Sequence, residues 1–274
     1  MSSFSSTQTT ALCCAIGAAS LSIMIGSPAR ARDDDAELAK KLSNPVAKLI
    51  SVPLQLNYDC CYGPEDGGRY TLNVQPVIPL SLNKDWNLIV RTIVPIVQQG
   101  RTTDQSGSAF GLSDTTQSFF FSPTKTHNGL VWAVGPALLW PTGEADLGTK
   151  KWGAGPTVLV LKQEHGLTYG LLANHIWSYA DVGGYDRPDV SQTFIQPFLS
   201  YTTHDATTFG ANIESSYNWK TNGWTVPINL SVSHLYKFGD QRVSLGGGAK
   251  AYAAQDGIGP EWGLRLVATF LYPE

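Results

Sequence analysis

Hydrophobic and polar residues alternate with a period of two along most of this chain. In the segment WTVPINLSVSHLY, residues 224–236, every second position forms one series: Trp224, Val226, Ile228, Leu230, Val232, His234 and Tyr236. A β-strand points successive side chains to opposite faces, so this pattern predicts a strand with an apolar face that begins and ends in an aromatic residue.

The same period recurs from residue 50 onward and predicts about twelve strands. We place them at residues 50–59, 69–82, 86–97, 113–123, 130–141, 152–162, 168–180, 191–203, 207–219, 224–236, 243–253 and 262–272. Most approach the roughly 9 to 11 residues that a tilted strand needs to cross a bilayer. The odd-numbered connections are mostly longer than the even ones, as expected if the odd loops face outside and both termini face the periplasm.

Aromatic residues stand at both ends of several apolar faces. The pairs are Trp224 with Tyr236, Tyr169 with Tyr179, and Trp262 with Tyr272. Twelve residues of tilted strand span roughly 30 Å along a membrane normal. Amphipathic rings prefer the headgroup depth, so the spacing predicts two aromatic girdles.

These patterns predict an all-β fold, an antiparallel transmembrane β-barrel of about twelve strands. The alternative is a secreted soluble β-barrel or sandwich that uses the apolar faces as its core. Prolines inside the predicted strands weigh against a regular sheet, because each one removes a ladder hydrogen bond. They are Pro53, Pro76, Pro79, Pro95, Pro197 and Pro227.

The composition is poor in charged residues, although the chain is not strongly hydrophobic on average. Charged residues make up 15% of the 274 residues, below the roughly 25% of typical soluble domains. The mean hydropathy is only -0.09, as expected when polar positions alternate with apolar ones. The net charge of -3 provides no basic field, so nucleic acid is not an expected partner.

The N-terminus predicts export. Residues 1–31 combine the apolar run ALCCAIGAASLSIMIG with the sequence Ala29-Arg30-Ala31, and we interpret them as a secretory signal peptide. An N-terminal membrane anchor is the alternative. Residues 32–49 form a short periplasmic lead-in with one or two helical turns, and residues 50–274 form the barrel. The expected location is the bacterial outer membrane, with its lipid and the barrel-assembly machinery as partners.

Only Cys60 and Cys61 follow the predicted signal peptide. Adjacent cysteines can bond only through a strained eight-membered ring, so no disulfide framework is expected. Metal binding or redox activity is a weaker alternative, because no His or second Cys pair stands near them. We expect two small residues at the edge of a loop.

If the apolar faces meet lipid, the opposite faces line a lumen, where charged and amide side chains select solutes. The predicted lumen-lining residues are Arg91, Glu214, Lys250, Arg265, Gln75, Asn174, Gln192, Gln196 and Asn229. The alternative is a structural hydrogen-bond network that fills a narrow barrel. Apolar residues share this face, which favours a narrow passage for small, partly apolar solutes: Ile89, Ile93, Val97, Phe194 and Phe198.

An outer-membrane lipid-modifying enzyme is the remaining alternative, because a Ser and a His on a barrel wall can act on lipid. His175 and Ser178 are the nearest candidates, but three residues apart they point to opposite faces of a strand. No metal-ligand spacing or phosphate-binding loop stands out, since LGGGAK lacks the Ser or Thr and the helix that would follow. We therefore expect no enzyme, no metal and no cofactor.

Several long motifs resemble one bacterial family. They are NPVAKLISVPLQLNYD, GGRYTLNVQPVIPLSLNKDWNLIVRTIVPIV, PTGEADLGTKKWGAGPTVLVLKQ, QPFLSYTT, WTVPINLSVSHLYKFG and GPEWGLRLVATFLYP. This set is similar to the outer-membrane transporter or phenol-degradation meta-pathway proteins, some of which carry the label neuromedin U. The resemblance covers nearly all of residues 44–274 and implies an outer-membrane β-barrel with a transport role that the family does not define. GLSD departs from the family's G-x-G-D, with Ser113 in place of the second glycine.

Overall fold

The computed structural model describes residues 29–62, 66–100 and 107–272. One helix precedes the sheet, α1 (Ala29–Leu42). The strands are β1 (Ile50–Tyr62), β2 (Gly67–Val74), β3 (Val77–Ser81), β4 (Trp86–Gln99), β5 (Ala109–Leu112), β6 (Thr115–Pro123), β7 (Leu130–Trp140), β8 (Lys151–Glu164), β9 (Leu167–Asp181), β10 (Ser191–Thr202), β11 (Thr207–Ile213), β12 (Ser215–Asn218), β13 (Gly223–Phe238), β14 (Gln241–Ala254) and β15 (Trp262–Tyr272).

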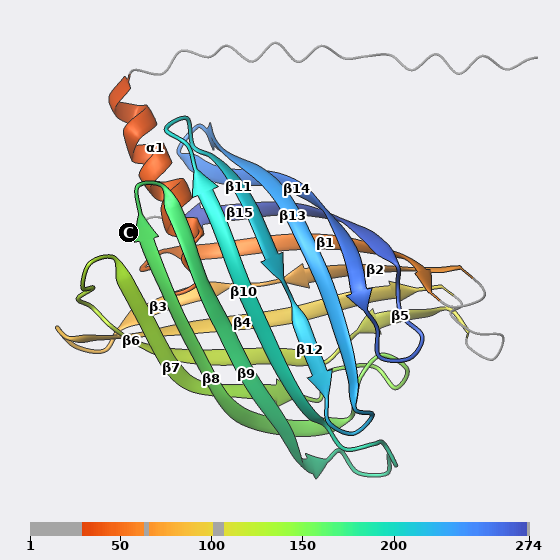
Figure 1. Ribbon diagram of the computed structural model, residues 1–274. Coiled ribbons are helices and arrows are strands. Elements are labelled where there is room, and N and C mark those ends of the chain that lie inside the picture. Colours follow the sequence, from red (N-terminus) through yellow and green to blue (C-terminus); the bar gives the residue numbers. More distant parts are fainter. Residues whose placement is uncertain (1–28, 63–65, 101–106, 273–274) are drawn as a thin grey trace, which may run out of the picture.

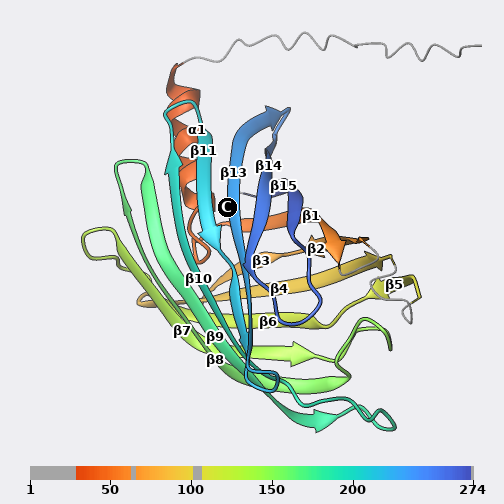
Figure 2. The same cartoon turned by 45° about the vertical axis from the view of Figure 1, so that its right-hand side comes forward.

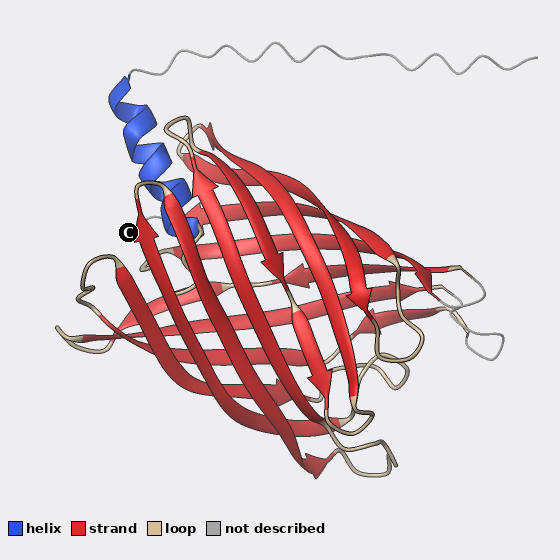
Figure 3. Ribbon diagram, in the orientation of Figure 1, coloured by secondary structure: helices blue, strands red, loops and turns tan. Residues whose placement is uncertain are grey.

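The strands close into a single antiparallel barrel (Figures 1 and 3). Neighbours in sequence pair with each other, and β15 pairs with β1 to close the ring. Three pairs of segments, β2 with β3, β5 with β6, and β11 with β12, are each one strand with an interruption, so the barrel has twelve strands. The predicted fold class is confirmed.

Each interruption involves a proline. Gln75 and Pro76 separate β2 from β3, Ser113 pairs with Pro95 between β5 and β6, and Glu214 pairs with Pro227 between β11 and β12. Proline lacks the N–H that the partner carbonyl needs, so the ladder loses a bond at these points. Pro76, Pro95 and Pro227 therefore coincide with interruptions that do not open the barrel, whereas Pro79 and Pro197 lie within continuous strands.

The apolar faces of the strands point outward. Large exposed hydrophobic residues occur on strands around the whole barrel, and they include both members of all three predicted aromatic pairs. Trp86 and Trp132 stack edge to face near one end of the barrel, and Tyr58 contacts Trp262 near the other. The alternative of a soluble sandwich with these faces packed together as its core is therefore wrong.

Helix α1 and residues 43–49 lie at the end of the barrel that carries the short even-numbered turns (Figures 1 and 2). Leu38, Ala39 and Leu49 pack against Ala206, Leu235 and Leu271 at this end. The helix is longer than the one or two turns expected, and it begins before the predicted signal cleavage site after Ala31. The rest of the predicted signal peptide, residues 1–28, lies outside the described residues.

Two further observations complete the fold. Among the described helices, none is both long and apolar enough to cross a membrane. Cys60 and Cys61 lie within β1 and are joined in a disulfide, at a point where the register between β1 and β2 shifts. The expectation of two unbonded residues at a loop edge is therefore wrong. Cys61 has a positive φ of 68°, which the ordinary strand pattern does not anticipate.

Candidate functional site: the barrel interior

The interior contains two cavities, one above the other along the barrel. The loop-end cavity, nearer the long odd-numbered loops, has a volume of about 320 Å³. The turn-end cavity, bounded by residues within 39–49 and by β1, β3, β4, β10, β11 and β13 to β15, has a volume of about 350 Å³. Gln75, Arg91 and Gln196 line both cavities, and we call these three residues the shared wall.

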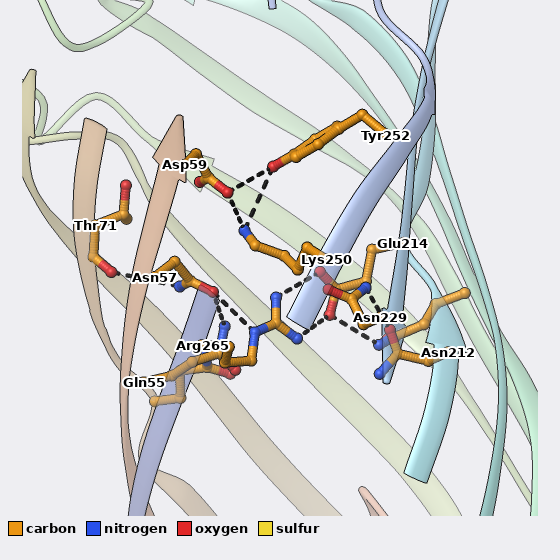
Figure 4. A network of polar contacts seen from close by, with 12 residues as sticks. Gln55, Asn57, Asp59, Thr71, Asn212, Glu214, Asn229, Lys250, Tyr252 and Arg265 are labelled. Carbon is orange, nitrogen blue, oxygen red and sulfur yellow. Dashed lines mark hydrogen bonds and ion pairs between the residues drawn. The ribbon is translucent and has the colours of Figure 1, made fainter. Parts of the chain in front are cut away.

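Glu214 and Arg265 form a bidentate ion pair close to the shared wall (Figure 4). Arg265 Nη1 and Nη2 donate to the two carboxylate oxygens of Glu214, each over 2.9 Å. Arg265 Nε donates to Asn57 Oδ1 over 2.8 Å, so all three nitrogen atoms of the guanidinium form hydrogen bonds. A fork of this kind fixes both side chains, because planar guanidinium and carboxylate groups match in geometry.

Lys250 forms a second ion pair, with Asp59 across the β1–β15–β14 seam. Both residues are paired in register with Gly263, so the glycine lies between them on the middle strand. A Cβ atom at Gly263 would lie 2.5 Å from Asp59 Oδ1 and 3.0 Å from Lys250 Cε. The Tyr252 hydroxyl donates to Asp59 Oδ1 over 2.8 Å and completes the cluster.

The amide residues extend this polar surface. Asn229 donates to Asn212 Oδ1 over 2.8 Å, and Gln196 Nε2 lies 3.5 Å from Glu214 Oε1. Asn174 and Gln192 line the loop-end cavity, with no side-chain hydrogen bond to the other predicted residues within the described chain. Seven of the nine predicted residues line one or both cavities, whereas Lys250 and Asn229 line neither, and only part of the nine form one network.

Arg91 differs from Arg265 and Lys250, which are both paired with an acid. Its Nη2 donates to Gln75 Oε1 over 3.0 Å, and no carboxylate of the described residues lies within the 4.0 Å of an ion pair. Glu214, the acidic group that acts on Arg91 electrostatically, forms its ion pair with Arg265. Arg91 therefore contributes an uncompensated positive charge to the shared wall.

At the turn end of the lumen, an apolar cluster packs against the N-terminal segment, which covers this end of the barrel. Val46 packs among Ile89, Phe120 and Leu161 inside the barrel, in a cluster that also includes Ala133, Leu159 and Leu172. Gln163 Nε2 donates to the carbonyl of Lys40 over 3.0 Å, and Arg242 pairs with Asp35 over 2.8 Å. These contacts on opposite sides hold residues 35–49 across the mouth of the barrel.

Sequence reasoning missed the partners of the predicted charges. Asp59, Asn57 and Tyr252 complete the two ion-pair clusters, yet none was among the candidates. Asp59 and Asn57 share the polar face of the first strand with Gln55. The signal was available: an acidic residue on the inward face of the strand that closes the barrel needs a cation on one of its neighbours.

The enzyme candidates His175 and Ser178 do not meet. The Ser178 hydroxyl accepts from the Val190 amide over 3.0 Å, while His175 Nδ1 lies 2.7 Å from Thr193 Oγ1. Ser191 Oγ lies 3.5 Å from His175 Nε2, at the limit of a hydrogen bond. In the part of the chain that the structure describes, no group of three His, Cys, Asp or Glu side chains could hold a metal ion.

Comparisons with known proteins agree with this architecture. No protein-family model and no curated protein matches the chain, so the phenol-degradation and neuromedin U labels find no support there. An outer membrane channel from Pseudomonas putida F1 is similar, with a TM-score of 0.66 and 13% identity over 82% of this chain and 96% of that one. The fold is that of an outer-membrane barrel.

Two porins give weaker matches. The KdgM porin has a TM-score of 0.46 at 11% identity over 81% of this chain and 99% of its own. The NanC porin has a TM-score of 0.46 at 12% identity over 81% of this chain and 98% of its own. At these values neither match adds to the fold assignment.

Proposed function

We propose that this protein is an outer-membrane channel that passes small solutes through the two cavities and past the shared wall. The observation that carries the proposal is the combination of an apolar outer surface with a hollow, polar interior. A barrel of this kind suits lipid on its outside and hydrated solutes on its inside. The outer-membrane location and the need for barrel-assembly machinery belong to the same proposal.

The interior favours small and partly apolar solutes over a broad range of ions. Ile93, Leu139 and Phe194 line the loop-end cavity together with amide groups, and most interior charges are paired with one another. A wide porin channel would carry more free charge along its wall. The resemblance to aromatic-degradation proteins is consistent with such solutes and identifies none of them.

Charge preference in planar bilayers tests the proposal. The refolded mature protein should open channels, and a salt gradient should give a reversal potential that reflects the Arg91 charge. Arg91→Glu should shift that potential toward cation preference, because it reverses the uncompensated charge at the shared wall. Lys84→Glu makes the same change in an exposed turn and should leave the potential unaltered.

Absence of conductance from protein that migrates as a folded barrel would contradict the channel proposal. Recovery of the mature chain in the periplasmic fraction without detergent would contradict the location. An unaltered reversal potential in Arg91→Glu would remove Arg91 from the conducting path.

A lipid-modifying activity has one observation in its favour, the contact of Ser191 with His175. The 3.5 Å separation is long, and no carboxylate of the described residues contacts His175, so the imidazole lacks the orienting acid of an efficient triad. We expect no hydrolysis of fluorescent phospholipid by the purified barrel. Hydrolysis that disappears in Ser191→Ala and in His175→Ala would revive the enzyme alternative.

A further inference from the structure

Arg91 is the one cation among the described residues that lines the loop-end cavity, and Lys41 lines only the turn-end cavity. The pairs Arg265 with Glu214 and Lys250 with Asp59 cancel each other's charge. Arg69, the next inward cation toward the loop end, lines neither cavity. Arg91 is therefore the one cation lining both cavities that lacks an acidic partner among the described residues.

The guanidinium of Arg91 has hydrogen-bonding capacity to spare. An arginine side chain offers five N–H donors, and Gln75 uses only one of those of Arg91. The group faces both cavities, so a solute in either cavity reaches it. A planar fork of free donors matches a carboxylate, which accepts two parallel hydrogen bonds, better than it matches a spherical ion.

Part of the cavity wall beside this cation is apolar, and the rest carries amide and hydroxyl groups. Ile93, which lies two residues beyond Arg91 on the inner face of β4, lines the loop-end cavity together with Leu139, Leu172, Ile176 and Phe194. The volume of about 320 Å³ lies at the low end of the roughly 300 to 1,000 Å³ typical of ligand pockets. The space therefore suits one small molecule with an apolar body.

We infer that the loop-end cavity binds small organic monoanions, a carboxylate carried on an aromatic or compact aliphatic body, with the carboxylate on Arg91. The apolar body lies against Phe194 and its neighbours, and amide groups such as Gln196 and Asn174 can donate to the remaining oxygen lone pairs. This inference names the solute class of the proposed channel and so rests on that proposal.

The ion pairs around the cavity strengthen this selectivity. Glu214 lines the same cavity, but Arg265 holds both of its oxygen atoms, so its charge repels an entering anion only weakly. A cation of the same shape would meet the free charge of Arg91 with no acid available to bind it. A neutral amide of that shape would offer the guanidinium one uncharged acceptor oxygen in place of two charged ones, and hydrogen bonds to a charged acceptor are stronger.

Binding of benzoate to the full mature protein in detergent tests the inference. By calorimetry, benzoate should bind at least roughly tenfold more tightly than benzamide, which has the same ring without the charge, because a hydrogen bond to a charged group is worth that much. Benzylamine, the cationic analogue, should bind no more tightly than benzamide. These measurements use the wild-type protein. Equal affinity for benzoate and benzamide, or tighter binding of benzylamine than of benzamide, would overturn the inference.

Variants then locate the site. Arg91→Gln should weaken benzoate binding by roughly tenfold or more, whereas Arg91→Lys, which keeps the charge and loses the fork, should fall between it and the wild type. Phe194→Ala should weaken benzoate binding as well, because it removes the ring from the apolar wall. The control Lys84→Gln should bind as the wild type does, and each variant must first show the migration of a folded barrel.

Conductance separates this inference from the proposed function. If the protein conducts but binds benzoate and benzamide equally tightly, the channel proposal stands and the inferred carboxylate site is wrong. If the folded barrel binds benzoate through Arg91 but never conducts, the carboxylate site stands and the channel proposal is wrong.

Discussion

Paired charges dominate the interior at the scale of single residues. Arg265 and Lys250 are almost fully buried, with 9% and 7% of their surfaces exposed, and each lies against a carboxylate. A buried charge without a partner is costly, so removing one member of a pair destabilises more than removing both. We therefore expect these two pairs to stabilise the barrel wall, which is the structural alternative considered for them from the sequence.

A double-mutant cycle measures this coupling. Arg265→Gln alone and Glu214→Gln alone should each lower the free energy of unfolding by about 3 to 5 kcal/mol, because each leaves one charge buried and unpaired. The double variant should lose less than the sum of the two. Heat-dependent migration of the detergent-solubilised barrel on gels provides the readout. Strict additivity would show that the two charges act independently.

Gly263 provides the space in which Lys250 meets Asp59. Gly263→Ala should destabilise the barrel by about 1 to 3 kcal/mol, because the added methyl group forces the neighbouring side chains and backbone apart. Gly247 on the adjacent strand is the matched control, since its nearest neighbours would be 3.5 Å from a new Cβ. Gly247→Ala should therefore have a small effect on the same thermal midpoint. Equal losses in both variants would contradict the role assigned to Gly263.

At the scale of elements, the period-two pattern predicts most of the strands within a few residues of their observed bounds. It succeeds because lipid on one side and polar groups on the other sort the residues of every strand by face. The interruptions at Gln75, Ser113 and Glu214 were not predicted. Their positions depend on the register between neighbouring strands, which the sequence of a single strand does not show. The disulfide in β1 was missed because general rules disfavour bonds between adjacent cysteines.

The N-terminal segment was predicted as a polar lead-in, and its packing inside the mouth of the barrel was not anticipated. Val46 is the one lead-in residue in the main interior apolar cluster, and a single valine in a short segment carries no periodic signal. Its partners come from strands far along the chain, including β4, β6 and β8. Only the closed barrel brings them to the same place.

Displacing this segment should widen the passage. Val46→Asp places a carboxylate among apolar side chains, which favours release of the segment because burying an unpaired charge is costly. Single-channel conductance should rise relative to the wild type. Lys84→Asp adds an acid in an exposed turn at the same end and should leave conductance unchanged. A conductance of Val46→Asp equal to that of the wild type, in a folded barrel, would show that the segment does not limit the passage.

At the scale of the whole molecule, the barrel wall is a single sheet with an apolar outer face and a largely polar inner face. The sequence predicts that wall, its apolar outer face and the inward position of the charged residues. It could not predict how the interior charges pair. One pair joins β1 to β14, and the other joins Glu214, between β11 and β12, to Arg265 on β15. These strands become neighbours only when the complete sheet has closed. The division of the lumen into two cavities follows from the same closure.

Lipid and water contact along β13 is the most direct test of the account. Spin labels attached singly to cysteines at residues 228 through 233, in barrels reconstituted into bilayers, report oxygen and water-soluble nickel accessibility by power saturation. We expect labels at Ile228, Leu230 and Val232 to favour oxygen, and labels at Asn229, Ser231 and Ser233 to favour nickel. Reversed alternation, or nickel access at all six positions, would contradict a barrel that turns its apolar faces to lipid and its polar faces to an aqueous interior.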